Sequence, residues 1–182
     1  PLRLTYLPRI RQNIHFANRL FQEAIGKYSY QGQHTYCYST RSAQFDFILR
    51  TVLDTGCQLE TSSAFDLDII LNLYERGLVD TNLYIICNGF KREEYQERIC
   101  KLINMGFNHC IPVLDNLKEL DYYEEHIKGE FSIGIRLAAD EEPHFEFYTS
   151  RLGIRYRAAA DYFKKRISGE SRVRLRMLHL NI

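Results

Sequence analysis

The sequence predicts an α/β protein whose parallel strands form part of a (β/α)8 barrel. Apolar, β-branched runs alternate with amphipathic stretches at short spacing along most of its 182 residues. Such runs are typical of buried strands, and the stretches between them are typical of helices. Strands that alternate with helices pair in parallel through right-handed crossovers. The expected strands are residues 34–40, 57–61, 82–88, 109–113, 131–138 and 172–181.

The stretches between these runs carry helical spacing of apolar residues. A helix is expected before the first strand, over residues 8–25, and others are expected over 43–55, 63–76, 92–105, 117–126 and 154–167. The serine pair Ser62 and Ser63 offers an N-cap for the third of these helices, and Gly77 suits its carboxyl end. The acidic, proline-containing segment 140–150 is predicted to be the longest loop, after the fifth strand.

Length limits how much of a barrel the chain can form. A complete (β/α)8 barrel usually takes about 250 residues, and no Ser/Gly linker divides this chain. We therefore expect residues 1–182 to be one domain, an incomplete barrel of about six strands from a longer protein.

Charge and composition exclude several classes of function. The 24 Lys and Arg residues balance 23 Asp and Glu residues, so no broad basic field favours nucleic acid or an anionic membrane. No stretch approaches the roughly 20 apolar residues of a membrane span, and no leader opens the chain. We therefore expect a cytoplasmic protein without nucleic-acid or membrane partners.

Cysteine and histidine spacing does not indicate a metal site. The five cysteines are odd in number and lack CxxC spacing, so we expect small buried hydrophobes and no nucleophile among them. The six histidines include no pair with the i, i+4 spacing of a helical metal site.

Several segments, in chain order, resemble the barrel of the biosynthetic arginine decarboxylases. These segments are LETSSAFDLDIIL, LYIICNGFKREEY, IGIRLA, SRLGIR and LRMLHLN, and the opening PLRLTYLPRI resembles the segment before that barrel. These enzymes belong to the alanine-racemase-like, fold-type III group that uses pyridoxal 5'-phosphate. The resemblance implies a barrel of the pyridoxal-phosphate-binding type, an amino-acid substrate, a role in polyamine biosynthesis and a homodimer. It also implies that strands seven and eight and a carboxyl-terminal β-domain lie outside this chain.

The resemblance places Arg41 at the catalytic lysine position. In the family, the first barrel strand ends in an aromatic residue, two further residues and the lysine that forms a Schiff base with the cofactor. Here the segment is Tyr38-Ser39-Thr40-Arg41. A guanidinium stays protonated and cannot form that bond, although it can bind a phosphate or pair with a carboxylate such as Glu60. Lys91, just past the third strand, is a poor substitute because the family-like segment already carries a lysine there.

Four further positions correspond to cofactor-binding residues by resemblance. Glu60 falls at the acidic residue at the end of the second strand, and Arg136 matches the arginine of the fifth. His179 and Asn181 occupy the His-x-His part of the sixth-strand motif, with asparagine in place of the second histidine. Structural interpretations stay open as well: Glu60 could be a surface or helix-capping carboxylate, and His179 a hydrogen-bonded strand residue. Arg136 interrupts an otherwise apolar strand, where a charge seldom lies without a partner.

Two functions therefore remain open. The chain is either the barrel portion of a pyridoxal-phosphate-dependent amino-acid decarboxylase, most like arginine decarboxylase, or a non-catalytic family member that acts as a ligand-binding or regulatory partner. Arg41 and Asn181 favour the second function, and Glu60 and Arg136 favour the first. We expect this chain alone to be inactive.

Overall fold

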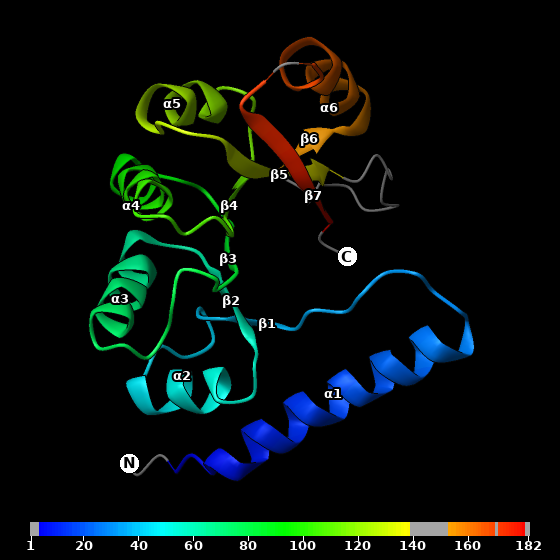
Figure 1. Cartoon of the computed structure of the whole chain (residues 1–182), viewed down its shortest axis with the longest axis vertical. Coiled ribbons are helices and arrows are strands. Elements are labelled where there is room, and N and C mark those ends of the chain that lie inside the picture. Colours follow the sequence, from blue (N-terminus) through cyan, green and yellow to red (C-terminus); the bar gives the residue numbers. More distant parts are fainter. Residues whose placement is uncertain (1–3, 139–152, 170, 181–182) are drawn as a thin grey trace, which may run out of the picture. The chain divides into compact units, whose positions relative to one another are not determined.

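The computed structural model describes residues 4–138, 153–169 and 171–180, and the chain divides into two compact units, Pro1–Thr61 and Ser62–Ile182. Figure 1 labels the helices and strands of both units. The predicted loop 140–150 and Asn181 lie outside the described residues.

The first unit contains α1 (Leu7–Lys27), β1 (Cys37–Ser39), α2 (Asp46–Leu53) and β2 (Gln58–Thr61). Strands β1 and β2 pair in parallel, as predicted, with Ser39 opposite Glu60. Helix α1 carries Pro8 in its first turn, where a missing backbone N–H does not interrupt the helix. An ion pair of 2.8 Å between Arg11 and Asp54 links α1 to the end of α2.

The second unit begins with three helices that alternate with three strands, as the sequence predicted. Its elements are α3 (Ala64–Glu75), β3 (Ile85–Cys87), α4 (Glu93–Asn104), β4 (Cys110–Leu114), α5 (Glu119–His126) and β5 (Phe131–Ala138). The strands β3, β4 and β5 pair in parallel in that order. The helices α3, α4 and α5 pack side by side along these strands (Figure 1). Their shared core consists of Leu67, Ile70, Leu73, Ile85, Ile99, Leu102, Leu114, Leu120, Ile133 and Ile135.

The predicted capping residues at both ends of α3 are confirmed. The Ser63 hydroxyl accepts a hydrogen bond of 3.3 Å from the Asp66 N–H, and the Asp66 carboxylate accepts one of 2.8 Å from the Ser62 N–H. The first of these bonds is an N-cap, which satisfies an N–H group that the first helical turn leaves free, and the second holds the preceding residue against the start of the helix. At the other end Gly77 adopts φ +69°, the left-handed conformation that ends helices.

The predicted helix 154–167 is partly wrong. The segment begins with a short strand, β6 (Ile154–Arg155), continues as α6 (Tyr156–Tyr162) and ends in a π-helical turn, Phe163–Ile167. Strand β6 pairs in parallel with the end of β5, with Ile154 opposite Leu137. Two residues are too few to show strand periodicity, so the helical pattern that follows conceals this strand.

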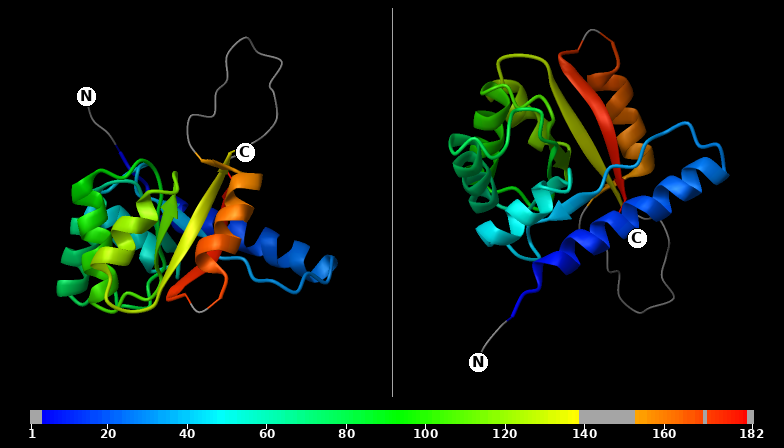
Figure 2. Two further views of the ribbon diagram at one scale, coloured as in Figure 1. Left: turned by 90° about the horizontal axis from the view of Figure 1, so that it is seen from above. Right: turned by 60° about the horizontal axis from the view of Figure 1, so that its bottom comes forward.

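The last strand, β7 (Val173–Leu180), pairs in parallel with β5 from Phe131 to Leu137. Figure 2 shows β5 and β7, in yellow and red, side by side. The register shifts by one residue between Ile133 and Gly134, because Arg176 is an extra residue in β7. This β-bulge places Met177 opposite Gly134 and His179 opposite Arg136.

All six predicted strands are therefore present, with ends that differ by a few residues, and all the pairings within each unit are parallel. No helix within the described part of the chain is long and apolar enough to cross a membrane.

Gly153 allows β6 to begin directly beside the end of β5. It adopts φ +106°, and a Cβ atom built on it would lie 2.9 Å from the backbone nitrogen of Ala138. We expect Gly153→Ala to lower the free energy of unfolding by about 2 kcal/mol or more, because the backbone of β5 cannot move aside cheaply. Chemical denaturation of the full chain measures this change.

Gly129→Ala is the matched control, since nothing lies within 4 Å of its added Cβ. It should change the free energy of unfolding by less than about 1 kcal/mol. Equal effects of the two substitutions would show that Gly153 does not closely approach β5.

Candidate functional site

In the second unit, four polar side chains gather where the strands end. Asn88 follows β3, Asp115 follows β4, and Arg136 and His179 lie near the ends of β5 and β7. Because these strands are parallel, their carboxyl ends meet at one edge of the sheet, where (β/α)8 enzymes carry their active sites. Arg136 and His179 were predicted site residues, and the register of β5 and β7 places them opposite each other.

Asn88 fixes the imidazole of His179. The Asn88 side-chain nitrogen lies 3.2 Å from Nε2 of His179, and its side-chain oxygen accepts a hydrogen bond of 2.8 Å from the Gly89 N–H. Since the oxygen already accepts from Gly89, the amide N–H group is the donor toward His179. Nε2 therefore accepts, which requires the hydrogen of the neutral ring to be on Nδ1.

Asp115 accompanies Arg136. Its Oδ1 lies 3.7 Å from a terminal nitrogen of Arg136, and the two side chains are only 3% and 12% exposed. Among the described residues, neither carboxylate oxygen of Asp115 has a hydrogen-bond partner. A buried carboxylate is expensive to leave uncompensated, so the positive charge of Arg136 is its main support.

Asp115 is not among the predicted site residues, although the sequence contains a signal for it. The residue comes directly after the apolar run of β4, the position at which a parallel strand presents polar side chains to a site.

The ammonium group of Lys91 forms hydrogen bonds at the ends of β3 and β4. Its side chain is fully buried, and its ammonium group donates to the carbonyl oxygens of Gly89, at 2.9 Å, and Val113. It also forms an ion pair of 3.1 Å with Glu119, the first residue of α5. All three donors of the ammonium group are therefore engaged within the described structure. Lys91 is a structural residue, which agrees with the prediction that it does not replace the missing lysine.

Glu119 connects Lys91 to the turn that carries Asp115. One of its carboxylate oxygens accepts a hydrogen bond of 2.8 Å from the Asn116 side chain. Burial raises the pKa of Glu119 above its ordinary value, the charge and hydrogen bond of Lys91 offset part of that increase, and the charge of Asp115 adds to it. The ionised carboxylate therefore depends on Lys91.

Arg41 and Glu60 lie in the first unit. Arg41 is exposed in the turn that follows β1, and Glu60 is a half-buried residue of β2. The N–H and hydroxyl of Thr40 both donate to the Glu60 carbonyl oxygen, at 2.9 and 3.1 Å. The two predicted residues therefore lie at the carboxyl ends of neighbouring parallel strands. Their roles, like those of Arg136, His179 and Asn181, stay predictions.

The thiols are poor candidates for a nucleophile. Four of the five cysteines are buried and Cys37 is half-buried. Burial raises the pKa of Cys37, Cys57 and Cys100 to about 11 in each case. These thiols stay protonated near neutral pH. Within the described ranges, no group of three or more His, Cys, Asp or Glu side chains has the arrangement to hold a metal ion.

Comparison with known proteins tests the resemblance. The chain is 26% identical over 140 residues to the biosynthetic arginine decarboxylase of Rhodopirellula baltica, which covers 75% of this chain and 20% of that protein. It is 26% identical over 168 residues to the biosynthetic arginine decarboxylase of Vibrio vulnificus, which covers 88% of this chain and 23% of that protein. The predicted resemblance to biosynthetic arginine decarboxylases is confirmed. The chain spans about a fifth of the length of these relatives, and no family model matches it.

Solved decarboxylase structures share the fold. A lysine decarboxylase from Selenomonas ruminantium superposes with a TM-score of 0.71 at 17% identity, covering 97% of this chain and 40% of that one. The biosynthetic arginine decarboxylase SpeA from Campylobacter jejuni gives 0.62 at 20% identity, covering 87% of this chain and 25% of that one. Together with the parallel strands, these likenesses confirm the predicted fold class, a partial (β/α)8 barrel.

We expect Lys91→Met to destabilise the chain by about 3–5 kcal/mol at about pH 8, because it leaves Glu119 buried without its cation. Losing Lys91 raises the pKa of Glu119 further above the ordinary 4.5. A carboxyl whose folded-state pKa is raised contributes stability at low pH that is lost as pH rises through that pKa. The deficit of the variant should therefore grow with pH, as measured by chemical denaturation between about pH 4.5 and 8.

The control is Lys101→Met, which removes an exposed lysine from the last turn of α4. Its effect should stay within about 0.5 kcal/mol at every pH. A Lys91→Met deficit that does not change with pH would contradict the pairing of Lys91 with Glu119.

Proposed function

We propose that the chain is the barrel portion of a pyridoxal-phosphate-dependent amino-acid decarboxylase, most like the biosynthetic arginine decarboxylases. The observation that supports this proposal is that the sequence similarity and the candidate site involve the same segments. The segments that resemble those enzymes are the ones that bring Asn88, Arg136 and His179 to one edge of the sheet. Under this proposal residues 1–182 belong to one barrel domain, completed by strands and a β-domain outside this chain.

The chain's own residues suit noncovalent binding of the cofactor. Arg136 presents a guanidinium that matches phosphate or carboxylate oxygens, and the neutral ring of His179 offers a flat face for the pyridine ring. We propose Glu60, Arg41 and Asn181 as further contacts of the bound cofactor. When bound, pyridoxal phosphate supplies an electron-withdrawing ring for loss of a carboxyl group.

The residues present do not fit covalent attachment of the cofactor. Arg41 stands at the lysine position, and its guanidinium stays protonated. Lys91 is fully buried, with its three donors engaged by Gly89, Val113 and Glu119. No catalytic step is therefore assigned to this chain alone.

The proposed substrate, oligomeric state and location follow from the same resemblance to biosynthetic arginine decarboxylases. The substrate is an amino acid, the complete protein is a cytoplasmic homodimer, and its product feeds polyamine biosynthesis. Balanced charge, with 24 basic and 23 acidic residues, gives no support for a nucleic-acid partner.

A second candidate function is a non-catalytic ligand-binding or regulatory protein of the same fold. Arg41 and the engagement of Lys91 favour it, because together they remove the amine that the reaction needs. Such a protein would bind a phosphorylated ligand noncovalently or pair with an active relative.

We expect the wild-type chain to bind pyridoxal phosphate reversibly, so that dialysis removes it and borohydride fixes no label at a specific residue. Arg41→Lys should instead give a yellow protein that borohydride reduction labels at residue 41, because a lysine amine can attack the aldehyde. Peptide mapping by mass spectrometry locates the label.

Arg41→Gln is the control for the loss of positive charge and should show no label at residue 41. Label on Arg41→Lys that is spread evenly over surface lysines would contradict the placement of Arg41 beside the cofactor. If the chain belongs to a decarboxylase, addition of arginine, ornithine or lysine should change the absorption band of the yellow, unreduced Arg41→Lys protein. An unchanged band with all three amino acids would favour the binding protein.

A further inference from the structure

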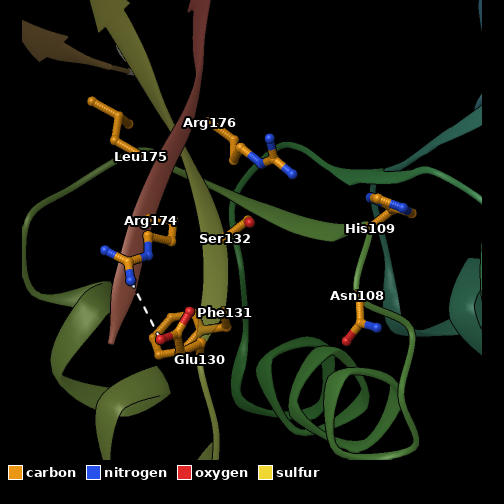
Figure 3. A pocket seen from close by; sticks show the side chains of 8 residues that line it. All are labelled: Asn108, His109, Glu130, Phe131, Ser132, Arg174, Leu175 and Arg176. Atoms are coloured by element: carbon orange, nitrogen blue, oxygen red, sulfur yellow. Dashed lines mark hydrogen bonds and ion pairs between the residues drawn. The ribbon is translucent and has the colours of Figure 1, made fainter. Parts of the chain in front are cut away.

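A hollow of about 560 Å³ lies at the opposite end of the sheet from the candidate site. It is bounded by the segment before β4 and by the amino-terminal halves of β5 and β7. Figure 3 shows the residues that line it, which include Asn108, His109, Glu130, Ser132, Arg174 and Arg176. Ser132 and Arg136 are four residues apart on β5, so the two ends are separated by about 13 Å.

The chemistry of this hollow differs from that of an ordinary barrel interior. The interior of a (β/α)8 barrel is normally filled by branched apolar side chains. Here a serine, a histidine and two arginines take their place. Both arginines are exposed to solvent, so their charged groups are accessible to a ligand that enters the hollow.

The β-bulge changes which residues of β7 lie opposite the residues of β5. Before the extra residue Arg176, Arg174 is opposite Ser132. After it, Met177 is opposite Gly134 and His179 is opposite Arg136. In a regular strand, residues of even and odd number face opposite sides. The bulge removes that restriction, and in Figure 3 Arg176 and the Ser132 hydroxyl point toward the side of the hollow where His109 lies, whereas Leu175 points away.

The positive charge of the hollow is only partly compensated. Arg174 forms an ion pair of 3.3 Å with Glu130, in which both side chains are more than half exposed. Arg176 has no hydrogen bond or ion pair with any of the described residues, and it is exposed to solvent. His109 stacks on Tyr84 with ring centroids 4.1 Å apart, which holds the imidazole at the wall of the hollow.

We propose that this hollow is a second ligand site, which binds a small molecule through a phosphate or carboxylate group. Arg176 provides the main charge-assisted hydrogen bonds, and Ser132, Asn108 and His109 provide neutral ones. Arg174 joins them when the ligand's anion competes with Glu130. The site is independent of the proposed cofactor site, because no lining residue belongs to both.

Titration of the labelled full chain with inorganic phosphate tests this proposal, with amide chemical shifts as the measurement and ionic strength held constant with chloride. We expect saturable shifts at Ser132 and His109. Arg176→Gln should weaken binding about tenfold, the loss expected for one charge-assisted interaction. Glu130→Gln should tighten binding about threefold, because it frees Arg174.

Two control variants distinguish this site from general charge effects and from the cofactor site. Arg157→Gln removes an exposed arginine whose hydrogen bond and cation–π contact, among the described residues, are both with Tyr156. Arg41→Gln removes an exposed arginine that is proposed as a cofactor contact. Both should leave phosphate binding at Ser132 and His109 unchanged. A parallel titration with succinate shows whether phosphate or carboxylate is the preferred group.

Three results would overturn the proposal: shifts that do not saturate, unchanged affinity in Arg176→Gln, or an equal loss in Arg157→Gln. A loss confined to Arg41→Gln would assign the phosphate to the cofactor site instead. Failure of reversible pyridoxal phosphate binding would leave this proposal intact, since the two sites share no residue.

Discussion

The parallel pairing of β5 with β7, including the one extra residue at Arg176, is the constraint on which the rest of the second unit depends. Before the bulge, Arg174 is opposite Ser132; after it, His179 is opposite Arg136. One strand therefore contributes polar residues of both parities to the same side of the sheet. Without the bulge, either the arginines or the residues Met177 and His179 would face the helices, and only one of the two proposed sites would exist.

The carboxyl end of the sheet is organised by charges that depend on one another. Lys91 joins the ends of β3 and β4 to Glu119, and Glu119 contacts the turn that carries Asp115. Asp115 in turn lies beside Arg136. Such a buried arrangement stabilises only while every partner is present. This explains why a lysine close to the expected cofactor position does not supply a reactive amine: its ammonium group holds the scaffold together.

The strands and most helices could be predicted because β-branched runs and helical periodicity are local properties of the sequence. The run 131–138 matches β5 at both ends. The bulge at Arg176, the short strand at Ile154 and the burial of Lys91 could not be predicted, because each depends on a partner 17 or more positions away, or on a register that the chain's own pattern does not encode. The family-like motifs indicated Arg136 and His179, but only the folded register shows that they are opposite each other.

The contact of Met177 with Gly134 tests the bulged pairing most directly. A Cβ atom built at Gly134 would lie 3.1 Å from the Met177 methyl carbon and 3.2 Å from a Val113 methyl carbon. The chain has only two methionines, so selective methyl labelling of the full chain gives two signals that are simple to assign. We expect nuclear Overhauser contacts from the Met177 methyl group to the α-protons of Gly134 and to Val113. Contacts to Ile167 on the helical side, and none to Gly134, would contradict it.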